Sequence, residues 1–350
     1  MKPSGLFLKV KKIFDRKFWA RFLGCNGFSR KVKMFWIFLS VILLSVILLA
    51  CCVEWLLVAP GFSPMLASGL ILKVKCPDQP GIVAKVAGYV SLHGGNLVEL
   101  AQFSDKLNAR FFARFEIETE GLDVEVEDFI EGFGTLGRGL HAEWHFRRLP
   151  HRMRTAVLVT RTSHCLQEIV WRTELGEIPV EITSVIGNRP DCAPVAERAG
   201  LRFHHVGMDG GAKQDGFRRI RQILDEENVE LVVLARFMQI LPEWMCGEFA
   251  GRIINIHHSF LPAFVGANPY RQAYERGVKL IGATCHYVTP DLDSGPIIDQ
   301  EVERVQHFHT PKDLQRLGRN CERIALARGI RYHVHDRTII DGRRAIVFPD

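Results

Sequence analysis

From residue 68 to about 147, short strand-like runs alternate with amphipathic helical segments. Residues 70–76 alternate apolar and polar side chains, as a half-buried strand does. In the next segment apolar residues recur at helical spacing and form one buried face: Ile82, Val83, Val86, Ala87 and Val90. The remaining pattern predicts strands at 97–103 and 109–118, a helix at 124–134 and a strand at 140–146. The order βαββαβ predicts a split βαβ fold.

The turn before the first helix carries signals for a helix start. We expect Asp78 to cap the helix with its carboxylate and Pro80 to occupy the first turn. The run His93-Gly94-Gly95-Asn96 is expected to end the helix.

The second half of the chain contains nearly continuous Val/Ile/Leu runs separated by amphipathic segments. Such runs are typical of parallel strands that are buried on both faces, and they occur at 155–160, 180–186, 231–235 and 252–256. Ser163 is expected to cap the first helix of this half, and Thr310-Pro311 to open a long helix near the end of the chain. The alternation predicts an α/β domain with a Rossmann-like, mostly parallel sheet.

Polar side chains stand at the ends of two apolar strands in this half. Residues 252–254 lead into Asn255 and His257, and residues 282–288 lead towards Asp293. The carboxyl ends of neighbouring strands are where open α/β sheets build active sites. An amide donor, an imidazole and a carboxylate suit acyl transfer, because two groups hold a developing oxyanion while the third manages a water molecule.

Composition and charge exclude several classes of protein. A hydrophobic content of 47% and a charged content of 24% indicate a globular chain. The net charge of +6 comes from the first 33 residues, where ten Lys/Arg against one Asp give +9 and leave −3 for the rest. A mildly acidic body argues against a nucleic-acid partner. Nine cysteines without a C-x-x-C pair indicate reduced thiols and a cytoplasmic protein.

The amino-terminal segment has two competing interpretations. Residues 34–53 are uncharged and, at about 20 residues, long enough to span a bilayer. A real anchor or an exported protein would place the body outside the cytoplasm, which conflicts with reduced cysteines. We favour residues 1–64 as an upstream extension, so membrane contact is expected only if residues 34–53 are translated and inserted.

Several common sites are missing from the sequence. No G-x-G-x-x-G follows a strand and no P-loop occurs, so no nucleotide cofactor is expected. The histidines lie outside H-E-x-x-H, so no metal is expected. Ser259 lacks the G-x-S-x-G context of a nucleophile. We interpret His258 and Ser259 as loop residues that support the site.

Two motifs resemble known families. The residues Asn255-x-His257-x-Ser259-x-Leu261-Pro262, with His286-Tyr287-Val288 and Asp293-x-Gly295-Pro296, resemble the folate-dependent formyltransferase family. The sequence D-Q-P-G-I-V at 78–83 resembles an ACT domain. The two together, over about 70–348, are similar to the formyltetrahydrofolate deformylases. The resemblance implies an ACT-like domain at 68–147, a linker at 148–154 and a catalytic domain at 155–350.

The resemblance also implies a reaction and a site. The expected reaction converts 10-formyltetrahydrofolate and water to formate and tetrahydrofolate, which balances the one-carbon folate pool for purine synthesis, without a cofactor. Asn255 and His257 would stabilise the oxyanion, and Asp293 would position or deprotonate water and pass a proton to the departing nitrogen. The pterin would lie between two walls, formed by Phe237, Met238, Gln239, Ile240 and Leu241 and by Thr289 and Asp291. Relatives often have Arg where this chain has Gln239.

Two other functions stay open at this stage. A formyltransferase would need a pocket for an amine acceptor, yet the first strand runs into Thr160–His164 instead of a glycine loop. A non-catalytic sensor would not need the intact Asn, His and Asp set. The ACT-like domain would bind an amino-acid effector or serve only for pairing, and a homo-oligomer is expected in either case.

Overall fold

The computed structural model describes residues 68–209, 211–261 and 269–349. The amino-terminal extension with its apolar segment 34–53 lies outside the described residues, as does Pro262 of the motif. Among the helices in the described ranges, none combines the length and the hydrophobicity needed to cross a bilayer.

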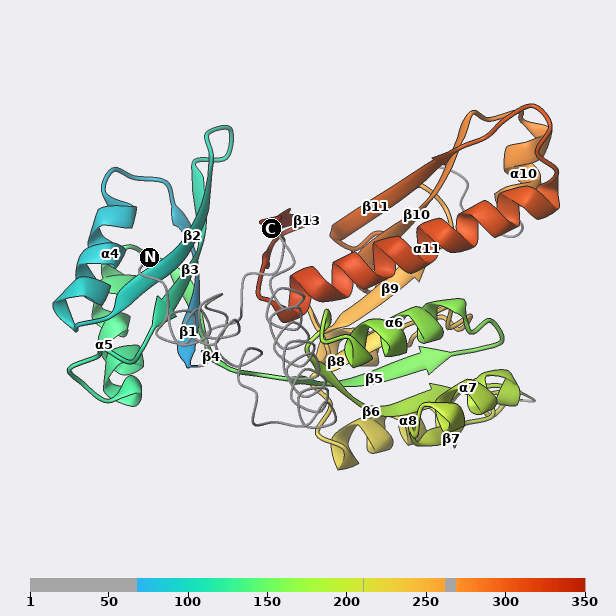
Figure 1. Ribbon diagram of the computed structural model, residues 1–350, viewed down its shortest axis with the longest axis horizontal. Coiled ribbons are helices and arrows are strands. Elements are labelled where there is room, and N and C mark those ends of the chain that lie inside the picture. Colours follow the sequence, from blue (N-terminus) through green and yellow to red (C-terminus); the bar gives the residue numbers. More distant parts are fainter. Residues whose placement is uncertain (1–67, 210, 262–268, 350) are drawn as a thin grey trace, which may run out of the picture. The chain divides into compact units, whose positions relative to one another are not determined.

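The first domain is a four-stranded antiparallel sheet with two helices on one face (Figure 1). Its elements are β1 (Gly69–Pro77), α4 (Ile82–Leu92), β2 (Asn96–Asp105), β3 (Arg110–Glu118), α5 (Val126–Gly139) and β4 (Glu143–Leu149). The spatial order is β2-β3-β1-β4. Phe115 of β3 and Phe129 of α5 are fully buried in the core between sheet and helices. The predicted βαββαβ order is therefore confirmed.

The start of α4 differs from the expectation. The helix follows Gly81, which has φ +83°, and no side chain caps it. Asp78 lies further back, and its N–H donates to the carbonyl of Ala109. The prediction of Asp78 as the cap is wrong because the chain makes an extra left-handed turn at Gly81, a conformation that glycine adopts without a steric penalty.

The second domain is a seven-stranded sheet in the order β11-β10-β9-β8-β5-β6-β7. Its strands are β5 (Met153–Val159), β6 (Val180–Gly187), β7 (Phe203–His205), β8 (Leu231–Leu234), β9 (Ile253–His257), β10 (Leu280–Tyr287) and β11 (Ile297–Arg304). Strands β5 to β9 pair in parallel, whereas β10 runs antiparallel to both β9 and β11. The mostly parallel, Rossmann-like sheet is confirmed, with an antiparallel edge.

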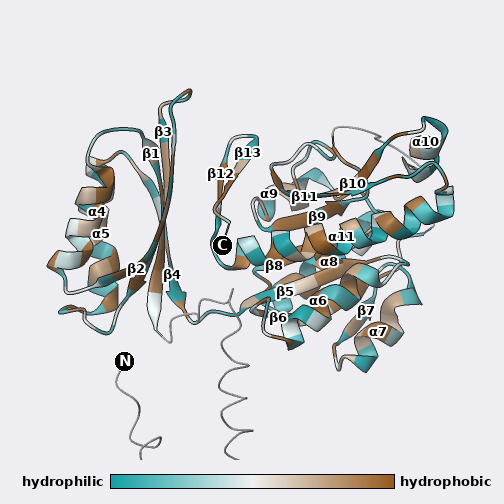
Figure 2. Ribbon diagram, turned by 45° about the horizontal axis from the view of Figure 1, so that its top comes forward, coloured by the Kyte–Doolittle hydropathy of each residue, from teal (hydrophilic) through white to brown (hydrophobic). Residues whose placement is uncertain are grey.

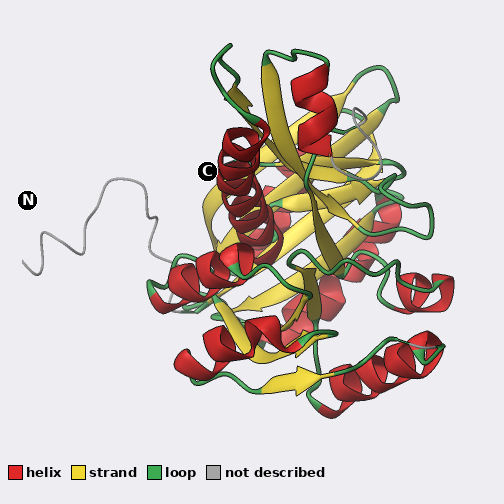
Figure 3. Ribbon diagram, turned by 90° about the vertical axis from the view of Figure 1, so that its right-hand side faces the viewer, coloured by secondary structure: helices red, strands yellow, loops and turns green. Residues whose placement is uncertain are grey.

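Helices cover both faces of this sheet (Figure 3). They are α6 (His164–Glu174), α7 (Ala193–Arg198), α8 (Lys213–Glu226), α9 (Glu243–Glu248), α10 (Pro269–Glu275) and α11 (Pro311–Val334), with a short 3₁₀ turn η1 (Pro190–Cys192). One core cluster lies beneath α6 and α11, and another beneath α8 and α9. In Figure 2, α11 alternates between hydrophobic and hydrophilic colours, as an amphipathic helix does.

Two predicted helix starts have different outcomes. Thr310 caps α11 through a capping box with Asp313, as expected for Thr310-Pro311. Ser163 is at the N-cap position of α6, but its hydroxyl caps no backbone N–H and instead accepts a hydrogen bond from Gln167.

The terminal hairpin joins the two domains. Strands β12 (Thr338–Asp341) and β13 (Arg344–Val347) follow α11. Ile339 and Phe348 pack against Phe112 of β3 in a small apolar cluster. Asp336, only 1% exposed, forms ion pairs with Lys73 at 2.8 Å and with Arg147. Ion pairs and apolar contacts between side chains together therefore hold the ACT-like sheet against the carboxyl-terminal hairpin.

Candidate active site

Strands β9 and β10 place the first polar side chains of the site. His257 ends β9, and Asn255 lies two residues before it on the same face of the strand. In the antiparallel register, His286 of β10 stands opposite Asn255. Because β10 runs antiparallel, its last residue, Tyr287, pairs with Ile254 near the start of β9, and His257 pairs with Thr284. The expectation that both strands deliver their residues at a common carboxyl edge is therefore wrong for β10.

The turn after β10 brings Asp293 back to His257. Asp293 adopts a left-handed backbone with φ +53°. The N–H of Tyr287 bonds the carbonyl of Pro296 at 2.9 Å, which closes the turn onto β10. Asp293 Oδ2 then lies 3.2 Å from Nδ1 of His257, and Oδ1 lies 3.6 Å from Nε2 of His286. The three predicted catalytic residues thus converge around one cavity.

His286 orients the amide of Asn255. Its Nδ1 is 2.8 Å from the carbonyl of Tyr287, so that nitrogen carries the proton. The other ring nitrogen, Nε2, then accepts from Nδ2 of Asn255 at 3.1 Å. In the sequence, His286 stands out only as part of the motif His286-Tyr287-Val288, so this role was not predicted. The one available signal was a histidine inside an otherwise apolar strand, seven residues before the carboxylate.

Two hydrogen-bond donors remain free to face a ligand. Nε2 of His257 is buried and has no partner in the described structure. Asn255 has a second N–H beyond the one given to His286. Both residues line the same cavity. Buried polar groups are normally paired, so an unpaired nitrogen at a cavity wall indicates a site for an oxygen acceptor.

His257 keeps Asp293 ionised. Burial by itself would raise the pKa of Asp293, but the hydrogen bond and charge of His257 lower that pKa far below the ordinary value of 3.8. A carboxylate so strongly stabilised is a poor proton acceptor but a good partner for an imidazolium. Asp293 is therefore suited to orient the ring of His257 through its Nδ1.

The cavity has a volume of about 280 Å³ and two walls. The first wall is the segment after β8, where all five residues predicted for the pterin line the cavity: Phe237, Met238, Gln239, Ile240 and Leu241. The second wall includes Val288, Thr289 and Pro290. Asp291 is not among the described lining residues, and its carbonyl accepts a hydrogen bond from the hydroxyl of Thr289 at 3.1 Å.

Two buried residues that the sequence analysis did not select anchor the first wall. The N–H of Met238 donates to the hydroxyl of Thr160 at 2.9 Å, and that hydroxyl donates to Asn188 Oδ1 at 2.7 Å. Both residues are buried. No sequence signal identified them, because they come from two other strand ends and meet only in the folded sheet.

The loop after β9 is fixed by Thr284. Its hydroxyl donates to the carbonyl of Ser259 at 3.0 Å and accepts from the N–H of Leu261 at 3.1 Å. His258 does more than shape this loop, since it lines the cavity. Burial, with the nearby charge of Arg236, lowers the pKa of His258 to about 4, so this ring is neutral at physiological pH.

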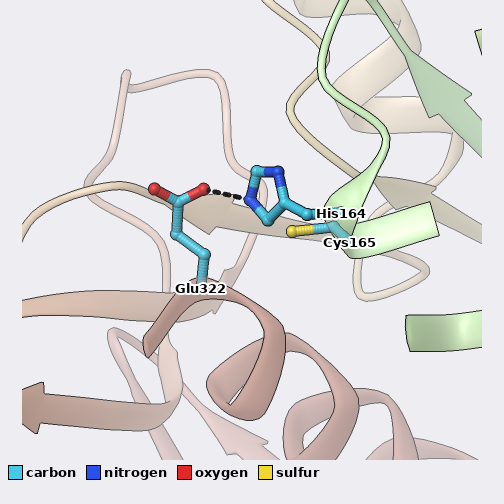
Figure 4. A group of neighbouring side chains, drawn as sticks. All are labelled: His164, Cys165 and Glu322. Carbon is cyan, nitrogen blue, oxygen red and sulfur yellow. Dashed lines mark hydrogen bonds and ion pairs between the residues drawn. The ribbon is translucent and has the colours of Figure 1, made fainter. Parts of the chain in front are cut away.

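One group of side chains has the residue types of a metal site. His164, Cys165 and Glu322 bring their ligand atoms within 4.8 Å of one another (Figure 4). Burial raises the pKa of Cys165 well above its ordinary value, which disfavours the thiolate that metals bind. Both carboxylate oxygens of Glu322 already have partners, in Tyr270 and His164. The chemistry of this group suits a hydrogen-bond network better than a metal centre.

Known proteins share this architecture. Residues 153–330 match the formyl transferase family and residues 70–129 match the ACT domain. The formyltetrahydrofolate deformylase of Bacillus subtilis is 41% identical over 278 residues, covering 79% of this chain and 93% of the relative. The one from Synechocystis is 40% identical, covering 79% and 97%.

Solved structures agree with these relatives. A formyltetrahydrofolate deformylase from Pseudomonas syringae superposes with a TM-score of 0.79 at 40% identity, covering 83% of this chain and 96% of that one. Glycinamide ribonucleotide transformylase 1 from Symbiobacterium toebii superposes with a TM-score of 0.55 at 34% identity, covering 58% of this chain and 97% of that one. The chain belongs to the formyltetrahydrofolate deformylase family.

Proposed function

We propose that the cavity holds 10-formyltetrahydrofolate with the formyl carbon between Asn255, His257 and Asp293. The enzyme is a hydrolase that releases formate and tetrahydrofolate. The observation that carries the site assignment is the pair of free donors, Nε2 of His257 and the second N–H of Asn255, facing one cavity beside an ionised carboxylate.

The chemistry follows from where charge develops. A water oxygen forms a bond to the formyl carbon, and the formyl oxygen becomes an oxyanion that accepts from Asn255 and His257. Asp293 holds the imidazolium of His257 and orients the water. Collapse breaks the bond between carbon and N10. Of the two protons of the attacking water, one is taken up by N10 and the other leaves to solvent, so that formate is released as an anion. The products are formate and tetrahydrofolate.

The folate pterin is proposed to lie against residues 237–241. Main-chain groups of this segment are held in place by Thr160 through the N–H of Met238. Met238 and Ile240 are 56% and 60% exposed, which leaves apolar surface for an aromatic ring to cover. On this arrangement Gln239, in place of the Arg often found in relatives, contributes through its backbone.

The discriminating assay is formate release with and without an amine. Purified full-length chain with 10-formyltetrahydrofolate and no acceptor is expected to release formate and tetrahydrofolate in equal amounts. Turnover only after a primary amine is added would instead support a transferase. No turnover in either arm would support a non-catalytic sensor. Dialysis against a chelator is expected to leave the rate unchanged, because the proposed steps need no metal or cofactor.

The ACT domain is proposed to bind an amino-acid effector and to pair with a second copy. Strand β2 is an edge strand, and its exposed apolar residues suit pairing between sheets: Val98, Leu100 and Phe103, which are 50%, 39% and 42% exposed. Sedimentation of the wild type and of Val98→Lys is expected to show an oligomer only for the wild type.

The effector is tested by measuring the rate of formate release in the presence of each of a panel of amino acids.

A further inference from the structure

A buried carboxylate stands beside the active-site cavity and has no part in the steps above. Glu322 of α11 is 1% exposed. Its Oε1 accepts from the hydroxyl of Tyr270 at 2.7 Å, and its Oε2 lies 2.8 Å from Nε2 of His164 (Figure 4). The same Oε2 lies 3.4 Å from Nε of Arg236 in an ion pair. Although burial would raise the pKa of Glu322, the bond from His164 and the charge of Arg236 lower it, so Glu322 is ionised.

Arg236 belongs to the cavity as well as to this cluster. In the parallel register of β8 and β9, Leu234 pairs with Asn255. Arg236 lies two residues beyond Leu234, as His257 lies two beyond Asn255, so the two stand at the same level on neighbouring chain segments. Arg236 has a left-handed backbone, with φ +65°, and a side chain only 17% exposed. Among the described residues that line the cavity, it is the only Lys or Arg.

Glu322 attracts one edge of the guanidinium of Arg236 and leaves the others available. Arginine carries five N–H donors in a rigid plane. Nε lies 3.4 Å from Oε2 of Glu322 in an ion pair without hydrogen-bond geometry, and the two terminal nitrogens are the groups that can reach a ligand. His258 does not provide a competing charge there, because its ring is neutral at physiological pH. Arg236 is thus a permanent cation held on the cavity wall.

Hydrolysis creates a need for such a cation. Formate is formed as an anion beside Asp293, which is itself ionised, and two carboxylates at short range repel each other. A planar guanidinium matches the two oxygens of a carboxylate. We propose that Arg236 binds the formate product and that Glu322 is the positioning residue that aims it. The inference rests on the proposed function.

Product inhibition tests this assignment in the full-length chain. Sodium formate is added to the wild type, Arg236→Gln, Arg236→Lys and the control Arg328→Gln, whose arginine pairs with Asp299 and Glu301 on β11. The inhibition constant for formate is expected to rise on the order of ten-fold or more in Arg236→Gln, since a charge-assisted hydrogen bond is lost. Arg236→Lys is expected to recover part of the affinity, and Arg328→Gln to match the wild type.

The same experiment can overturn the proposal. A wild type that formate does not inhibit, or an Arg236→Gln variant whose inhibition constant changes less than about two-fold, removes the formate role. An equal change in Arg328→Gln would point to a general effect of charge and would also overturn it. In each variant the change in the formate inhibition constant is compared with the change in KM for 10-formyltetrahydrofolate. A loss of product binding alone is expected to change KM less, whereas a general distortion of the cavity would change both constants alike.

Glu322→Gln tests the positioning role. The variant keeps the shape of the side chain and removes its charge, so Arg236 loses its fixed partner. A smaller rise in the formate inhibition constant is expected, with the melting temperature recorded to follow stability. An unchanged inhibition constant would remove Glu322 from the proposal. Isothermal titration of the protein with formate gives the same comparison without turnover. It therefore distinguishes a failure of the proposed hydrolysis from a failure of Arg236 to bind formate.

Discussion

At the scale of single residues, the site depends on which nitrogen of each histidine carries a proton. His286 gives Nδ1–H to the carbonyl of Tyr287 and therefore accepts from Asn255. His257 faces Asp293 with Nδ1, and its Nε2 has no partner in the described structure and can bind the ligand. The motif contains Asn255, His257 and Asp293, but it does not assign these protons. The partner of His257 is Asp293, from another segment, and the partner of His286 is the carbonyl of Tyr287, whose position depends on the folded strand.

Asp293→Asn should separate charge from shape in the site. The amide keeps the size of the side chain but cannot stabilise an imidazolium at His257. We expect kcat to fall on the order of 10²–10³-fold with little change in melting temperature. Steady-state formate release measures the rate.

Asp291→Asn is the matched comparison for that variant. Asp291 lies in the same turn, but its described contact is through its carbonyl. Its rate is expected to stay near that of the wild type. Equal losses in both variants would show that the turn, and not the charge of Asp293, controls the rate.

At the scale of elements, the turn between β10 and β11 determines where Asp293 points. A Cβ at Gly295 would meet the carbonyl oxygen of Tyr287 at 1.8 Å. Glycine is therefore required there by close approach of two backbone segments. The presence of the strands and their succession along the chain were predictable from apolar periodicity. The direction of β10 and this tight turn were not, since both depend on pairing with β9 and β11.

Gly295→Ala is expected to displace the turn and with it Asp293. We expect kcat to fall by about 10–100-fold, because small misplacements of a catalytic group are costly. Gly88→Ala in α4 is the control, since its Cβ would meet nothing within 4 Å. That helix variant should gain about 0.5–1 kcal/mol of stability and keep full activity. Wild-type activity in Gly295→Ala would show that the turn tolerates the shift.

At the scale of the whole molecule, buried charge connects the two domains. Asp336 pairs with Lys73 and Arg147 of the ACT-like sheet. Burial would raise its pKa, but those two cations lower the pKa to about 2. In the sequence, Arg147 stands beside the predicted linker at 148–154 and no pattern identifies its partner. The fold places it in β4 as a partly buried partner of Asp336, with its side chain 17% exposed.

Asp336→Asn should destabilise the protein strongly. Removing one member of a buried ion pair leaves uncompensated charge, which costs about 3–5 kcal/mol. Glu127→Gln is the control, because the pair of Glu127 with Arg148 is exposed to solvent and contributes little to stability. Urea unfolding of both variants measures the difference. Similar free energies of unfolding would mean that the interface does not depend on Asp336.

Acid should weaken the interface through two histidines beside Asp336. Burial lowers the pKa of His335 to about 4 and that of His333 to about 3, against an ordinary value of 6.5. Below about pH 6.5 these two histidines bind protons in the unfolded chain but stay neutral in the folded chain. The free energy of unfolding therefore falls as the pH drops towards 4. The carboxylate of Asp336 stays ionised over this range.

Unfolding free energies at pH 7.5 and pH 5 measure the effect. Each histidine is expected to contribute a loss of roughly 1–2 kcal/mol at pH 5. His335→Gln should reduce the pH dependence, since it removes one titrating group. A stability that does not change between the two pH values would contradict the assignment of neutral, buried rings.

The sequence by itself determined which residues are apolar, where strands and helices alternate, and which amide, imidazole and carboxylate the chain offers. Those properties are local, because periodicity and capping act over a few neighbouring residues. Tertiary structure alone decided that β10 turns back beside Asn255, that Thr160 and Asn188 hold the segment after β8, and that Glu322 meets Arg236. Each of these contacts joins segments tens of residues apart, and only the packed sheet brings them within hydrogen-bond distance.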